Sequence, residues 1–72
     1  MILKLTKDEA IQAMKEGSKV THRYFGNEEW IKMAPDGRYE TEDGYLINPA
    51  LFWTDRRLEQ WDSGWSIFRV RS

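Results

Sequence analysis

The sequence predicts a single α+β domain, in which one N-terminal helix packs on a small antiparallel sheet of about four to five short strands. Three observations support this fold class. Helix-capping residues bracket residues 6–17, the spacing of apolar residues changes from helical to alternating after Gly17, and turn signals then separate short apolar runs. A chain of 72 residues is expected to form one domain, residues 1–72.

The segment TKDEAIQAMKEG, residues 6–17, has the signals of a complete helix. Thr6 and Glu9 have the spacing of a capping box, in which each side chain accepts from the other residue's backbone N–H. Lys15 suits the last turn, where the helix dipole favours a cation, and Gly17 suits the left-handed residue after a helix. We expect a helix of about ten residues. Its apolar stripe would consist of Ala10, Ile11, Ala13 and Met14.

Short runs of β-branched and aromatic residues after Gly17 predict strands that pair in sequence order. Turn signals at Gly26–Asn27, at residues 34–38 and at the acidic turn 42–44 separate them, so the centre of the chain is expected to be an antiparallel meander. The expected strands lie at 19–25, 28–33, 38–41, 44–48 and 64–71, with an edge strand at 2–5. Alternation places Val20, His22 and Tyr24 on one face of the first strand and Thr21, Arg23 and Phe25 on the other.

Between the last two strands, Asn48 followed by Pro49 has the pattern of a helix cap and a first helical residue. The apolar residues 51–53 would pack such a turn against the core. We therefore expect a short helix or an ordered loop in this segment.

The composition argues against several function classes. Without cysteine there are no disulfides or thiolate metal sites, and His22 is the single histidine, so no metal site is expected. A net charge of -1 argues against a general nucleic-acid binder. The opening residues contain no long apolar run, so we expect neither a secretion signal nor a membrane span, and place the protein in the cytoplasm.

Catalytic patterns are missing as well. The serines do not form a nucleophile elbow, and no glycine-rich loop of the Walker or dinucleotide type occurs. The carboxylate pairs Glu28–Glu29 and Glu42–Asp43 fall at predicted turns, where solvated charge is the ordinary explanation. We expect a binding protein without a cofactor and not an enzyme.

Ten aromatic residues are more than one short helix can cover, since each ring buries roughly 150–250 Å². Some rings should therefore face a cleft, a ligand or another subunit. The rings expected in the core are Trp30, Tyr39, Trp65 and Phe68. Those beside turns or charges, for which core and exposed roles both fit, are Tyr24, Phe25, Trp53 and Trp61.

Three arginines, Arg23, Arg56 and Arg57, neighbour these aromatic residues. A guanidinium group stacks on rings and binds phosphate through two hydrogen bonds, although surface arginines also lay their apolar stems on a protein without binding anything. Flat rings combined with such cations suit a nucleotide-like ligand.

Several short motifs resemble those of small phage-encoded proteins of the Thoeris anti-defence type, which act as sponges for cyclic nucleotide immune signals. These motifs are EGSKVTHRYFGNEEWIKM after the helix, DGY at 43–45 and the closing DSGWSIF. Gly17, Lys19, Val20 and Trp65 match the family pattern. His22 stands where the family has arginine, Phe25 where it has tryptophan, and Gly64 where it has an acid.

The resemblance implies an α+β protomer in a homo-oligomer, with pockets between subunits in which Phe25 stacks on the ligand and Asp62 and Ser63 form a polar wall. It leads us to expect a non-enzymatic phage protein that sequesters a cyclic-nucleotide-type signal in the host cytoplasm. The alternative is an inhibitor that docks on a host defence or phage protein through Trp53 and Trp61, as anti-CRISPR proteins do. The candidate ligand-binding residues are His22, Arg23, Tyr24, Phe25, Asn27, Trp53, Arg56, Arg57, Trp61, Asp62 and Ser63.

Overall fold

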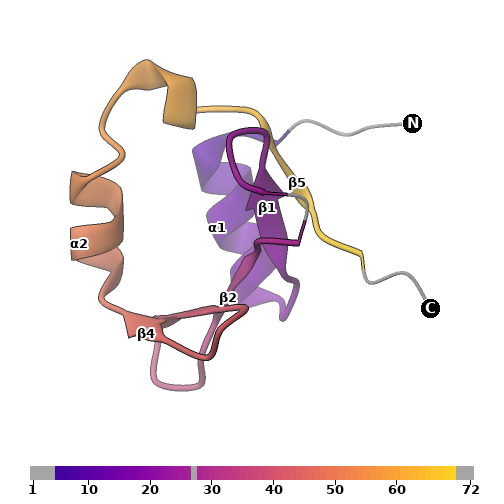
Figure 1. The fold of residues 1–72 in the computed structure, drawn as a ribbon, viewed down its shortest axis with the longest axis vertical. Coiled ribbons are helices and arrows are strands. Elements are labelled where there is room, and N and C mark those ends of the chain that lie inside the picture. The colour runs from indigo at the N-terminus through magenta and orange to yellow at the C-terminus, as the bar shows by residue number, and fades with distance from the viewer. Residues whose placement is uncertain (1–4, 27, 70–72) are drawn as a thin grey trace.

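The computed structural model describes residues 5–26 and 28–69, and it confirms the α+β class. The elements are α1 (Lys7–Lys15), β1 (Val20–His22), β2 (Ile31–Met33), β3 (Tyr39–Thr41), β4 (Leu46–Ile47), α2 (Pro49–Thr54), the 3₁₀ turn η1 (Glu59–Trp61) and β5 (Trp65–Ile67). All neighbouring strands pair antiparallel, in the order β4-β3-β2-β1-β5. Figure 1 shows β1 and β5 side by side. The predicted meander is therefore present, and β5 extends it on the far side of β1.

Helix α1 begins and ends as the sequence predicts. The Glu9 N–H donates to Thr6 Oγ1 over 3.2 Å, and the Thr6 N–H donates to Glu9 Oε1 over 2.9 Å, so the capping box is complete. Gly17 has a φ of 97°, a left-handed conformation that suits glycine. Ala10 and Met14 are buried in the stripe that α1 turns towards the sheet.

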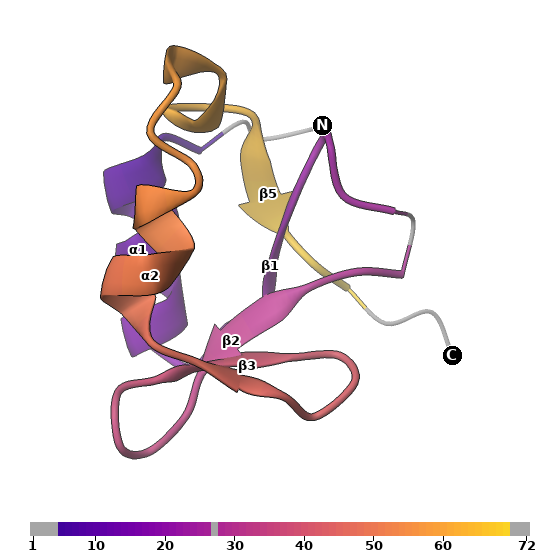
Figure 2. The same cartoon turned by 60° about the vertical axis from the view of Figure 1, so that its left-hand side comes forward.

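The second helix forms where Asn48 and Pro49 indicated it. Asn48 Oδ1 accepts from the Ala50 N–H over 2.8 Å, Pro49 occupies the first turn, and Phe52 is buried. From α2, the chain crosses from the β4 edge of the sheet to the β5 edge through η1, which the sequence analysis did not predict (Figure 2).

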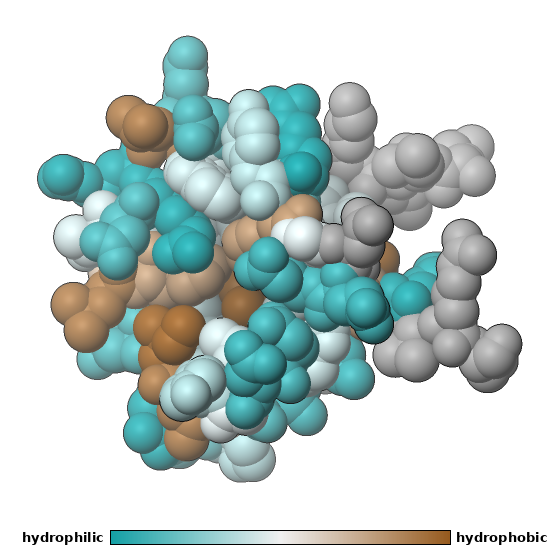
Figure 3. Space-filling model, viewed as in Figure 1, coloured by the Kyte–Doolittle hydropathy of each residue, from teal (hydrophilic) through white to brown (hydrophobic). Residues whose placement is uncertain are grey.

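Both helices contribute to one core on one face of the sheet. The buried core cluster consists of Ala10, Met14, Val20, Ile31, Tyr39, Phe52 and Trp65. On the surface, hydrophobic residues gather on the side of α2 and β4 (Figure 3), where Leu46 and Leu51 are exposed. Within the described residues, no helix is long and apolar enough to cross a bilayer.

The first strand is shorter than the predicted strand 19–25, and this changes which residues face inward. It ends at His22 because the Phe25 N–H donates to the His22 carbonyl over 2.8 Å, which closes a turn. Tyr24 is therefore exposed and does not continue the buried face of Val20 and His22. Phe25, predicted on the opposite face, turns inward against Trp65, with 5.6 Å between ring centroids.

Other strand boundaries also differ from the prediction. The strand expected at 64–71 extends only over Trp65–Ile67, and residues 70–71 lie outside the described part of the chain. Of the edge strand expected at 2–5, residues 2–4 also lie outside it, and Leu5 makes a single bridge to Trp65.

Trp30 and Phe68 were expected in the core and lie outside the buried cluster. Both are half-buried and pack on each other, with ring centroids 6.3 Å apart, and Lys19 Nζ lies 4.3 Å from the Trp30 centroid. Each immediately flanks a core-facing strand residue, Ile31 or Ile67, and alternation therefore directs it away from the core.

Candidate functional site

The surplus of aromatic rings predicted from the sequence is present in the structure. Tyr39, Phe52 and Trp65 are buried, whereas Tyr24 and Tyr45 are 58% and 70% exposed. The remaining rings are half-buried: Phe25, Trp30, Trp53, Trp61 and Phe68. Some aromatic surface therefore remains available to a ligand or partner.

A cleft of about 520 Å³ lies where three segments distant in sequence meet. These segments are the β1–β2 loop (residues 23–26 and 28–30), the β3–β4 turn (residues 42–45), and α2 with the residues that follow it. Phe25 and Trp30 form part of the wall from the loop, Tyr45 from the turn and Phe52 from α2. We refer to this space as the aromatic cleft.

Arg56 is the cation of the aromatic cleft. Its guanidinium carbon lies 4.0 Å from the centroid of Phe52 and 5.2 Å from that of Trp61, and Nη1 donates to the Phe52 carbonyl over 3.3 Å. Its buried Nε has no hydrogen-bond partner among the described residues. Burial lowers the pKa of Arg56 from its ordinary value, and the negative charges of Asp55 and Glu29 oppose this change. Because Nε is buried, a ligand in the cleft would have to reach the terminal Nη groups, of which Nη1 already donates to the Phe52 carbonyl.

Three carboxylates also line the aromatic cleft: Glu29, Glu42 and Asp43. Glu29 Oε1 accepts from the Gly26 N–H over 2.7 Å, and Glu42 Oε1 accepts from the Trp30 N–H over 3.3 Å. One oxygen of each thus holds the local backbone, and the other oxygen has remaining acceptor capacity. The end of the cleft near the β3–β4 turn therefore suits N–H donors, whereas Arg56 suits an anion.

His22 lies beside the cleft and is 3% exposed. Its Nδ1 accepts from the Tyr24 N–H over 3.1 Å, so the proton of the neutral ring is on Nε2. Nε2 donates to the Ser63 carbonyl over 2.7 Å and lies 3.2 Å from the Gln60 carbonyl. Burial lowers the pKa of His22, and the positive charges of Arg23 and Arg56 act in the same direction, against the two carbonyl hydrogen bonds. The neutral imidazole therefore ties β1 to the segment around η1.

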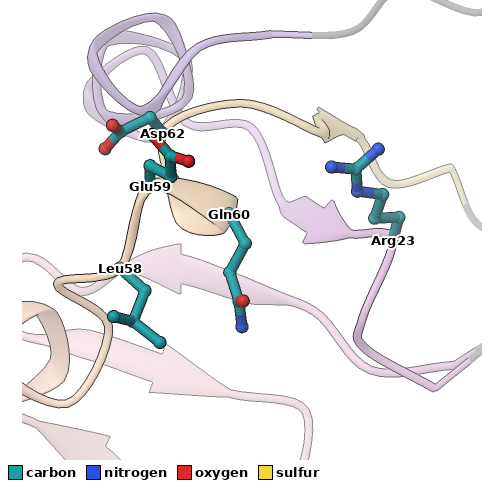
Figure 4. A pocket seen from close by; sticks show the side chains of 5 residues that line it. All are labelled: Arg23, Leu58, Glu59, Gln60 and Asp62. Atoms are coloured by element: carbon teal, nitrogen blue, oxygen red, sulfur yellow. The ribbon is translucent and has the colours of Figure 1, made fainter.

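A second, shallower depression lies between the end of β1 and the η1 segment. It has a volume of about 680 Å³ and is lined by Arg23, Leu58, Glu59, Gln60 and Asp62. In Figure 4, Arg23 comes from the end of β1 and the other four side chains come from η1 and its flanks. The Arg23 guanidinium carbon lies 5.4 Å from the ring centroid of Tyr24. This depression is more open than the aromatic cleft and has fewer rings.

The predicted site residues divide between these places. Phe25 and Arg56 line the aromatic cleft, and Arg23 and Asp62 line the second depression. Trp61 packs on His22 at 4.3 Å between ring centroids and lines neither of them.

Trp53, Arg57 and Ser63 do not line the aromatic cleft. Trp53 donates through Nε1 to the Tyr39 hydroxyl over 2.9 Å, and Lys7 Nζ lies 4.6 Å from the Trp53 centroid. Arg57 and the Ser63 side chain are exposed. Asn27 lies outside the described residues.

Sequence reasoning missed the contribution of the β3–β4 turn to the cleft. The sequence places Glu42 and Asp43 in a solvated turn and Tyr45 in the strand 44–48, because their proximity to Phe25 and Arg56 depends on how the meander folds back. The signal that could have found them is the DGY motif, which places an aromatic residue directly after an acidic turn. Among the described residues, no group of three potential ligands could hold a metal ion.

Comparison with protein-family models, curated proteins and solved structures finds no match for this chain.

Proposed function

We propose that this protein is a non-enzymatic binding protein that holds a nucleotide-derived small molecule in the aromatic cleft. The observation that carries the proposal is the combination of flat rings, carboxylate acceptors and the Arg56 guanidinium around one cleft of about 520 Å³. Small-molecule sites have volumes of roughly 300–1,000 Å³ and combine apolar walls with a few polar groups.

The base and the phosphate of a nucleotide each have a counterpart in the cleft. A base stacked on Phe25 or Trp30 would gain about 1–3 kcal/mol. The amino or ring N–H groups of that base would donate to Glu42 or Asp43, and a phosphate would accept from Arg56. Because three carboxylates stand against one guanidinium, the cleft favours a ligand with few phosphates over a polyphosphate.

The resemblance to the Thoeris anti-defence sponges supports a biological role for such binding. In this role the protein is phage-encoded, forms a homo-oligomer in the host cytoplasm and lowers the free concentration of a cyclic-nucleotide-type signal by mass action. No bond of the signal is broken, which is consistent with the absence of recognisable catalytic motifs in the sequence.

Calorimetry against cyclic mononucleotides, cyclic dinucleotides and cyclic ADP-ribose isomers tests the proposal. We expect at least one of these compounds to bind, and Phe25→Ala to weaken that binding by about 5- to 150-fold through lost stacking. Leu51→Ala, an exposed change outside the cleft, is the matched control and should bind normally. Glu42→Gln, at an exposed residue of the cleft, tests the carboxylate acceptor and should also weaken binding. Binding of no compound in the panel contradicts the proposal.

We infer a second candidate function, inhibition by docking on a host or phage protein, from the exposed apolar side chains. Leu51 and Leu58 are 65% and 66% exposed, whereas the docking anchors expected from the sequence, Trp53 and Trp61, are half-buried against the core. A defined complex that is lost in Leu51→Glu and retained in Phe25→Ala would favour docking. Binding that is lost in Phe25→Ala and retained in Leu51→Glu, together with nucleotide released from the protein, would favour the first candidate.

A further inference from the structure

The surroundings of His22 leave one place for a second proton. Nε2 already carries hydrogen and is directed at the Ser63 and Gln60 carbonyls, so an incoming proton has to bind Nδ1. The Tyr24 N–H occupies that position at 3.1 Å from Nδ1. Two N–H groups cannot share this contact, and protonation therefore requires the Tyr24 backbone to move away.

Rotation of the ring does not offer an alternative. Four aromatic rings surround the imidazole at centroid distances of 4.3–6.2 Å: Tyr24, Phe25, Trp61 and Trp65. Gly64 approaches so closely that a Cβ there would lie 3.2 Å from His22 Nε2. On the Nε2 side the positive charge would strengthen the bonds to the carbonyls, so the Tyr24 side is the one that opens.

The charged and titratable groups around His22 favour the neutral ring. Arg23, next to it on the chain, and Arg56, from the segment after α2, are cations that lower its pKa. Tyr24 is the titratable group of the adjoining turn. The η1 segment brings the carboxylates of Glu59 and Asp62, which are exposed around the second depression together with Arg23.

We propose that His22 is a proton-operated latch for the aromatic cleft. A proton on Nδ1 displaces the Tyr24 N–H, opens the turn that returns Phe25 to the core, and withdraws the Phe25 ring from the cleft wall. The η1 segment stays attached through Nε2. This inference holds whatever ligand the cleft takes, so it does not depend on the proposed function.

Nuclear magnetic resonance on the intact protein tests the latch. We expect the Tyr24 amide and the His22 ring carbons to titrate with one midpoint below the ordinary histidine value of about 6.5. Exchange protection of the Tyr24 and Phe25 amides, corrected for intrinsic rates, should fall by up to about tenfold per pH unit below 6.5, as release linked to one proton requires. Protection of the Trp65 amide, paired with Leu5, should change less.

Two variants separate the latch from a general loss of stability. His22→Asn keeps an acceptor near Nδ1 that does not titrate, and His22→Gln keeps a donor near Nε2. Tyr24 protection should be independent of pH in His22→Asn. The proposal is overturned if the wild-type ring titrates without change at the Tyr24 amide. It is also overturned if the ring stays neutral down to the pH of global unfolding, or if all amides lose protection together. All three outcomes are measured on the wild type, so they decide even if a variant does not fold.

Discussion

At the scale of single residues, the contacts of His22 determine the local structure at the end of β1. His22 was a candidate ligand-binding residue, and the structure gives both ring nitrogens backbone partners inside the core. Its contacts set where β1 ends and where Phe25 points. The ring therefore contributes to the site by positioning Phe25.

Gly64 is the residue that allows this close packing. Its φ is 89°, and a Cβ there would lie 3.2 Å from both His22 Nε2 and Arg23 Nε. Gly64→Ala should lower the free energy of unfolding by about 2–4 kcal/mol, because the left-handed conformation and the crowding both cost stability. Gly44→Ala is the matched control, with a φ of 86° and open space around it, and should cost about 1–2 kcal/mol. Equal losses in urea unfolding would show that the contact with His22 is unimportant.

The lowered pKa of His22 also predicts how stability depends on pH. The unfolded chain binds a proton near pH 6.5, and the folded chain binds it only at lower pH. The contribution of neutral His22 to the free energy of unfolding is therefore fully present above about pH 6.5. It is lost as pH falls from there through the pKa of His22 in the folded protein. Urea unfolding between pH 7.5 and 4.5 should show this fall in the wild type and a flatter profile in His22→Asn. Hydrogen bonds from Arg38 lower the pKa of Asp36, so protonation of Asp36 affects the free energy of unfolding only in more acidic solution.

At the scale of elements, the helices were predictable and the strand ends were not. Helix signals are local: the capping box at Thr6 and the Asn48–Pro49 pair each act within one turn of chain. The turn that ends β1 is closed by the Phe25 N–H on the His22 carbonyl. The His22 ring, which accepts from the Tyr24 N–H in the same turn, is held by carbonyls about forty positions away. The contribution of the β3–β4 turn to the cleft was missed for the same reason, since this turn comes near Phe25 only through sheet pairing.

The local character of the α1 cap leads to a simple prediction. Thr6→Ala removes the acceptor for the Glu9 N–H and should lower the free energy of unfolding by about 1 kcal/mol. Thr6→Ser keeps a hydroxyl and should retain most of the stability. Both values come from urea unfolding monitored by circular dichroism. A similar loss in the two variants would mean that the Thr6 methyl group, and not the cap, stabilises the helix.

At the scale of the whole molecule, the aromatic cleft results from the path of the chain. The meander ends at the β4 edge, and α2 and η1 return across one face to place β5 beside β1. This return brings Arg56 between Phe52 of α2 and Trp61 of η1. Arg56 then lines the same cleft as the acidic β3–β4 turn. No single segment contains the cleft, so its chemistry depends on the complete fold.

Arg56 therefore offers a way to separate folding from binding. Arg56→Met keeps an unbranched stem against Phe52 and Trp61 and removes a partly buried charge whose Nε has no partner among the described residues. Because an unpaired buried donor costs free energy, unfolding stability should change by less than about 1 kcal/mol or rise. Affinity for a phosphate-bearing ligand found by calorimetry should fall by about 10- to 150-fold, the equivalent of one charge-assisted hydrogen bond. A large loss of stability with unchanged affinity would instead make Arg56 a structural residue and place the phosphate elsewhere.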